Sequence, residues 1–175
     1  APASLAHCTL SDLSGDSLAL ADTEGELVLP PGAHWLVGAS PDSALNGGLV
    51  PDLTYDGFFL SNSEDEVILT CAGEMIDTVA YNADTWPMSA GRSLSLDGAL
   101  PQDEVTNDDP ASWCAAPTPY TVNNYGTPGE ANPSCPIPDD TVDACRLVSP
   151  ISLELIVESP WSATAVVFDE DITDQ

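Results

Sequence analysis

The sequence contains no lysine, and Arg92 and Arg146 are its only Lys or Arg residues against 29 Asp and Glu side chains, so the formal net charge is −27. Proteins that bind nucleic acid or anionic membranes use clustered Lys and Arg side chains to contact phosphate groups. The composition therefore argues against nucleic acid and anionic lipid as partners. It is consistent with a secreted or saline setting, because such a surface favours screening ions or cations.

Long apolar runs are also missing. No run approaches the roughly 20 residues that a membrane-spanning helix needs, so we expect no membrane insertion. The hydrophobic fraction of 43% nevertheless argues for a folded chain with a core rather than a disordered acidic tail. Because the sequence starts with Ala1-Pro2-Ala3, without an initiator Met or a signal-peptide pattern, we expect it to be a processed or excised piece.

Helical periodicity is absent as well, since no stretch repeats apolar residues at helical spacing over three turns. Short segments with strand character lie instead between turn residues, among them 12 Gly and 16 Pro. The clearest are residues 66–70 and 75–81, which are rich in β-branched side chains and which 71–74 joins as a hairpin turn. Further strands are predicted at 17–20, 33–38 and 93–97, with Ser93 and Ser95 on a half-exposed face. The pattern predicts an all-β sandwich.

The composition changes near residue 135, where several Pro and Asp residues follow one another. We predict a first domain over 1–135 and a stiff linker over 136–142. Residues 143–175 carry strand candidates at 151–157 and 163–168, but two strands do not make a stable domain. This segment is therefore either the start of a second, truncated β domain or a set of strands that dock on the first.

Several motifs in the first domain occur in a recognisable order. They are a strand with Asp77, Val79 and Tyr81, then Trp86-Pro87, Gly91-Arg92-Ser93-Leu94-Ser95-Leu96-Asp97, Asn107-Asp108, Trp113-Cys114 and the closing Gly126-Thr127-Pro128-Gly129-Glu130-Ala131-Asn132. With Cys8-Thr9-Leu10-Ser11-Asp12 and Leu29-Pro30-Pro31-Gly32 upstream, the chain resembles a lamin tail domain of the bacterial, secreted kind over roughly residues 5–135.

This resemblance implies an immunoglobulin-like β sandwich that serves as an interaction or accessory module and has no general catalytic site. Members of the family usually begin with two further strands before the position of Cys8, and almost nothing precedes Cys8 here. We therefore expect an unpaired strand edge, to which 151–157 or 163–168 can add.

The five cysteines are most simply explained by disulfide bonds in an oxidising compartment, with buried free thiols as the main alternative. Cys8 starts one predicted strand and Cys71 ends another, while Cys114 follows Trp113 and Cys135 closes the family-like terminal turn. We predict the bridges Cys8–Cys71 and Cys114–Cys135. Cys145, beyond the linker, is left unpaired.

The candidate catalytic and metal-binding residues have simpler explanations. His34, beside Trp35 on an alternating strand, is assigned to packing or surface rather than to catalysis. Asp103, Glu104, Asn107, Asp108 and Asp109 supply oxygen ligands in one loop, but their spacing is not that of an EF-hand, so calcium remains an alternative to a solvated loop and is not predicted. We predict no catalytic residues, no metal and no cofactor.

The sequence thus predicts a non-catalytic binding or structural module of a larger secreted or cell-surface bacterial protein, with other proteins or cell-surface components as partners. The location is extracellular or at the cell surface, with the periplasm as an alternative. The rival hypothesis is an accessory domain of a secreted hydrolase, a nuclease or phosphatase, whose catalytic domain lies outside this chain.

Overall fold

The computed structural model describes residues 2–20, 27–137 and 165–167, the last as backbone only. Within these ranges the chain consists of short β-strands, loops and one 3-10 turn, η1, so the predicted all-β class is confirmed. The elements in chain order are β1 Ala3–Ser4, β2 Cys8–Ser11, β3 Ser17–Ala19, β4 Val28–Leu29, β5 Trp35–Gly38, β6 Leu53–Thr54, β7 Glu64–Cys71, β8 Glu74–Asn82, β9 Leu94–Leu96, η1 Pro110–Ser112, β10 Trp113–Ala115 and β11 Ala165–Val167.

The largest sheet is antiparallel and has the strand order β3-β2-β7-β8. Its longest strands form the predicted hairpin of β7 and β8, which turns through Ala72 and Gly73 and places β8 at the edge of the sheet. Both residues have positive φ, 51° and 84°, which is typical of the two-residue turns that match the twist of a hairpin. A bulge near Leu69 and Thr70 shifts the register toward the turn end of the hairpin.

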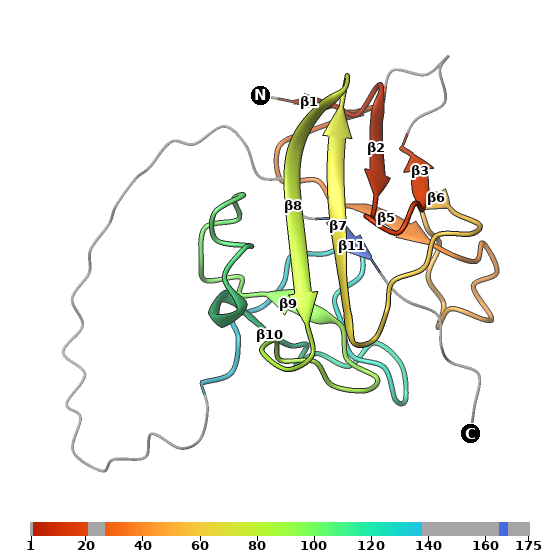
Figure 1. The fold of residues 1–175 in the computed structure, drawn as a ribbon. Coiled ribbons are helices and arrows are strands. Elements are labelled where there is room, and N and C mark those ends of the chain that lie inside the picture. The colour runs from red at the N-terminus through yellow and green to blue at the C-terminus, as the bar shows by residue number, and fades with distance from the viewer. Residues whose placement is uncertain (1, 21–26, 138–164, 168–175) are drawn as a thin grey trace, which may run out of the picture.

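The second layer is made of shorter pieces. β5 lies between β6 and β11 in a parallel three-stranded sheet, and β9 pairs with β10 in an antiparallel ribbon. In Figure 1, β5 and β11 lie behind the four-stranded sheet and run across it, and β9 and β10 lie below them. The two layers give the molecule a sandwich-like form, with its interior between β2, β7 and β8 on one side and β5 and β9 on the other.

The buried core is concentrated at one end of the sandwich. Leu5, Cys8, Leu10, Leu20 and Phe58 form one cluster, and Tyr55 packs edge-on to Phe58 with the ring centroids 6.0 Å apart. At the other end Trp86 is 6% exposed, and its ring lies 5.4 Å from that of Trp113. The two indoles therefore fill the end of the interior opposite the Phe58 cluster with large apolar rings.

One segment far along the chain joins this fold. β11 runs parallel to β5, with Ala165 opposite Trp35 and Val167 opposite Val37. This is part of the 163–168 segment that was expected to add to an open edge. The 151–157 segment and most of the 136–142 linker lie outside the described residues, so the division into domains stays a prediction.

The described part of the chain contains no helix that is both long and apolar enough to cross a membrane.

Candidate functional site

A disulfide bond joins Cys8 to Cys71 across the four-stranded sheet. The two residues are direct partners in the β2–β7 register, and their Cα atoms are 4.0 Å apart. The N–H of Ala72 donates to the carbonyl of His7 at 3.0 Å, so the adjacent pair is the hydrogen-bonded one and the two cysteines occupy a narrow, non-hydrogen-bonded position of the ladder. Side chains approach most closely there, which allows neighbouring strands to be bridged.

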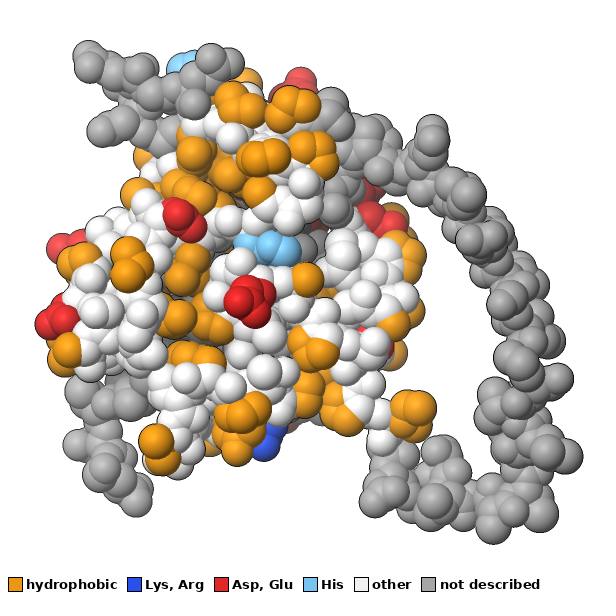
Figure 2. Space-filling model, turned by 180° about the vertical axis from the view of Figure 1, so that it is seen from behind, with side chains coloured by type: hydrophobic (Ala, Val, Ile, Leu, Met, Phe, Trp, Pro, Cys, Tyr) orange, Lys and Arg blue, Asp and Glu red, His pale blue; other side chains and the backbone are white. Residues whose placement is uncertain are grey.

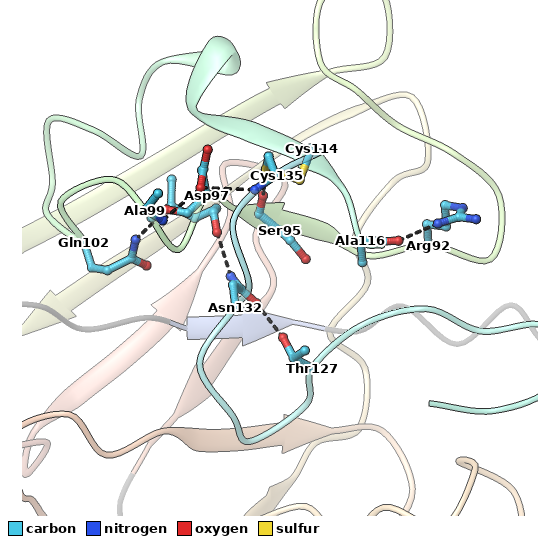
Figure 3. The surroundings of a disulfide bond; sticks show 11 residues. Arg92, Ser95, Asp97, Ala99, Gln102, Cys114, Ala116, Thr127, Asn132 and Cys135 are labelled. Atoms are coloured by element: carbon cyan, nitrogen blue, oxygen red, sulfur yellow. Dashed lines mark hydrogen bonds between the residues drawn. A yellow bond between two sulfur atoms is a disulfide. The ribbon is translucent and has the colours of Figure 1, made fainter. Parts of the chain in front are cut away.

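The second disulfide bond joins Cys114 of β10 to Cys135 at the end of the closing segment. The N–H of Cys135 also donates to Asp97 Oδ1 at 3.1 Å, so the closing segment is attached beside β9 by a covalent bond and a hydrogen bond (Figure 3). Both disulfide pairs are those that the sequence predicts. Cys145 lies outside the described residues.

Ser95 differs from its predicted environment. It is only 3% exposed, whereas the alternation along 93–97 predicted a half-exposed side chain. The reason is its pairing: Ser95 stands opposite Cys114 in the β9–β10 register, so the Cys114–Cys135 bridge covers this position. Alternation identified the face of the strand correctly but could not show that a later segment returns to cover it.

Two carboxylates of the acidic loop after β9 accept hydrogen bonds from the loop itself. Asp103 accepts from the N–H of Thr106 at 2.8 Å, and hydrogen bonds from the backbone and hydroxyl of Thr106 hold the pKa of Asp103 below its ordinary value. Asp109 caps η1 by accepting from Ala111. Glu104 and Asp108 are exposed. Across residues 2–20 and 27–137, no three His, Cys, Asp or Glu side chains gather as metal ligands would.

His34, which the sequence assigns to packing or surface, immediately precedes β5 and is half-buried.

The closing turn is held to β9 by one side-chain amide. Asn132 accepts from Thr127 Oγ1 at 2.6 Å and donates through Nδ2 to the carbonyl of Leu96 at 3.0 Å (Figure 3). Gly129, with φ of 76°, supplies the left-handed residue that the tight turn needs. The Thr127–Asn132 hydrogen bond therefore closes the turn, and the Asn132–Leu96 hydrogen bond attaches it to β9.

Between the two layers lies a cavity of about 1000 Å³. One wall is the inner face of the four-stranded sheet, and the opposite wall comes from β5 and β9. Residues from the segments 46–51, 60–62, 86–93 and 120–125, together with Asn107, Trp113 and Asn132, also contribute to the lining. Apolar side chains from both walls face the space: Leu10, Val67, Leu69 and Val79 from the large sheet, and Leu36, Val37, Leu94 and Leu96 from the other layer. The size lies at the upper end of the range found for small-molecule sites.

One corner of the cavity is polar. Asn107, 8% exposed, donates through Nδ2 to Asp77 Oδ2 at 2.7 Å, and its backbone carbonyl accepts from the indole N–H of Trp113 at 2.9 Å. Trp113 in turn packs on Trp86. Contacts thus connect Asp77, Asn107, Trp113 and Trp86, all of which line the cavity, and we call this group the polar corner.

Sequence reasoning placed Asn107 in an exposed acidic loop, and the structure corrects this. The 97–112 segment folds back so that Asn107 reaches the first inward-facing residue of β8, 30 positions earlier. The Asn-Asp dipeptide with a Trp six residues after the Asn was the available signal, because the indole N–H needs a partner when it is buried. Nothing in the local pattern indicated that the partner would be a backbone carbonyl of that loop.

Arg92 lies elsewhere on the cavity lining, and its side chain contacts a backbone carbonyl and an aromatic ring of the same chain. Its Nη1 donates to the carbonyl of Ala116 at 2.6 Å, and its guanidinium carbon is 3.7 Å from the centroid of the Tyr125 ring. Such a cation–π contact, together with a charge-assisted hydrogen bond, holds the side chain in place. Figure 2 shows one face of the molecule, where hydrophobic side chains lie among white surface and the blue of Lys and Arg appears only near the lower edge.

Comparison of the chain with protein-family models, with curated proteins and with solved structures finds no match. The site therefore has to be interpreted from its own geometry.

Proposed function

We propose that this chain is a non-catalytic binding module of a larger secreted or cell-surface bacterial protein, of the lamin-tail kind, and that its ligand occupies the cavity between the two layers. The observation that carries the proposal is the cavity itself: about 1000 Å³ with predominantly apolar walls from both sheets. Enclosed apolar surfaces with a few convergent polar groups are the usual form of a small-molecule site.

The chemistry of the lining supports binding rather than catalysis. Among the described residues that face the cavity, Asp77 is the single carboxylate, and neither His nor Cys is present. Hydrolysis by paired acids needs two carboxylates, and a serine nucleophile needs a base beside it. The lining offers hydrogen-bond acceptors and apolar contact area.

The two disulfide bonds support the proposed location. Such bonds persist in oxidising compartments, which include the cell exterior and the periplasm. The hydrogen-bonded closing turn around Asn132 supports the lamin-tail part of the proposal, since this is the most specific of the motifs that carry the resemblance.

The test is binding of Nile red, a neutral apolar dye, followed by fluorescence titration. We expect saturable one-to-one binding by the native protein and loss of at least about tenfold in affinity for Val79→Trp, which fills the cavity from β8. Ala80→Trp is the matched control, because Ala80 is the next residue of the same strand and is exposed. Retained disulfides and β-sheet circular dichroism establish that each variant is folded.

Absence of dye binding by the native protein would contradict the proposal. So would hydrolysis of ester, phosphodiester or glycoside substrates that Val79→Trp abolishes and Ala80→Trp preserves.

A further inference from the structure

The polar corner contains a buried hydrogen-bond acceptor without a partner. Asn107 Oδ1 is shielded from solvent and accepts no hydrogen bond from the described residues. The orientation of this amide is determined by its neighbour: Nδ2 points at the Asp77 carboxylate, and the reversed amide would set oxygen against oxygen. An unpaired carbonyl oxygen in a buried corner leaves its negative partial charge uncompensated beside the Asp77 carboxylate, so a cation bound at Asp77 is favoured.

Asp77 provides a second acceptor in the same corner. Its Oδ1 accepts from the N–H of Thr78 at 2.8 Å and its Oδ2 accepts from Asn107 Nδ2 at 2.7 Å. Each carboxylate oxygen has more than one lone pair, so acceptor capacity remains. Both of these donors are neutral, and Asp77 is half-buried, a position in which a carboxylate gains most from a cationic partner.

The surrounding groups also favour a cation. Trp86 and Trp113 lie in the same corner, and the faces of indole rings attract ammonium groups. The net charge of −27 raises the local concentration of cations around the protein. Arg92 is the one described Lys or Arg residue, and its charge is directed to the Ala116 carbonyl and the Tyr125 ring.

We propose that the cavity takes a primary amine with an apolar body. The ammonium group donates to the Asp77 carboxylate beside Asn107, and the body lies along Leu69, Val79 and Leu96. The inference rests on the proposed function, because it assigns the class of ligand to the same cavity.

The experiment is isothermal titration of the full chain at neutral pH with three molecules of the same shape: phenylbutylamine, phenylbutanol and phenylbutyrate. We expect the amine to bind about tenfold or more tightly than the alcohol, since hydrogen bonds to charged groups are the stronger kind, and the carboxylate to bind most weakly. Added salt should weaken binding of the amine and leave that of the alcohol unchanged.

Two variants locate the head group. Asp77→Asn keeps the shape and the acceptor for Asn107 and should lower the affinity for the amine about tenfold with little effect on the alcohol. Glu74→Gln removes one charge from the same strand at an exposed position outside the cavity lining and should change neither affinity. The comparison of ligands on the native protein decides the question even if Asp77→Asn fails to fold.

Equal affinities for the amine and the alcohol, or unchanged binding of the amine by a folded Asp77→Asn variant, would overturn the inference. If none of the three molecules binds while Nile red still does, the inference fails and the proposed cavity function stands. If Nile red does not bind either, the proposed function itself has failed.

Discussion

The side-chain amide of Asn132 donates to the backbone carbonyl of Leu96, 36 residues earlier in the chain, at 3.0 Å. Asn132 also accepts from Thr127, so the same side chain closes the terminal turn and attaches it to β9. Three residues further on, Cys135 is tied to Cys114 on the neighbouring β10. The closing turn at 126–132, the motif on which the family resemblance mainly rests, thus attaches the end of the chain segment to the sandwich.

Asn132→Ala removes both of these side-chain hydrogen bonds. We expect the free energy of unfolding to fall by about 1–3 kcal/mol, because the carbonyl of Leu96 and the hydroxyl of Thr127 lose their common partner. Guanidinium denaturation measures the change. Asn123→Ala, an exposed residue in the preceding loop, serves as the control, and an equal loss for both variants would contradict the role given to Asn132.

The two disulfide bonds should contribute unequally to stability. Cys8–Cys71 spans 63 residues and Cys114–Cys135 spans 21. From the entropy of the loops that they close, replacing the first pair by Ala should cost about 4 kcal/mol and the second about 3 kcal/mol. Denaturation of the two double variants tests this order.

Thiol labelling of the native protein with peptide mapping should modify Cys145 alone, and label on any other cysteine would contradict the predicted pairing.

Asp12 should make stability depend on pH in the acidic range. The hydroxyl of Ser14 and the backbone N–H groups of Asp16 and Gly15 donate to its carboxylate and hold the pKa of Asp12 below its ordinary value. The folded state therefore favours the ionised form, and this contribution is present above the unfolded pKa of about 4 and lost as the pH falls through the folded pKa.

For Asp12→Asn we expect lower stability than the native protein at neutral pH and a difference that shrinks below about pH 4. Urea midpoints measured across this range test it, with Glu74→Gln as the exposed control. A difference that is constant with pH would show that the lost hydrogen bonds alone, and not the charge of Asp12, explain the effect.

β11 should protect the edge of β5. Truncation after residue 142 removes the parallel partner of residues 35–37. Amide hydrogen exchange in β5 should then become faster by about tenfold or more, while amides of the central strand β7 keep their rates. Unchanged exchange in β5 would mean that the strand pairing contributes nothing to its protection.

The charge composition predicts what the protein does not bind. With two Arg and no Lys, there are too few cations to displace the counterions of a nucleic acid or an anionic bilayer. Gel-shift and liposome sedimentation assays at physiological salt should detect no association. Salt-sensitive binding at micromolar protein would contradict this prediction.

The sequence by itself was sufficient for the features that depend on local pattern. Alternating and β-branched residues marked the β7–β8 hairpin, and Cys8 and Cys71 could be paired because each lies at the end of a strand. These inferences succeed because side-chain direction in a strand alternates with every residue and because turn residues interrupt the strands.

Only the tertiary structure could bring the polar corner together. Asn107 and Asp77 are 30 residues apart, and the loop that carries Asn107 was expected to face solvent. The burial of Ser95 under the second disulfide and the pairing of β11 with β5 are likewise contacts between segments far apart in the sequence. Each depends on where a later segment returns to the sheet, and that path is set by the free energy of packing the whole chain, which no local pattern contains.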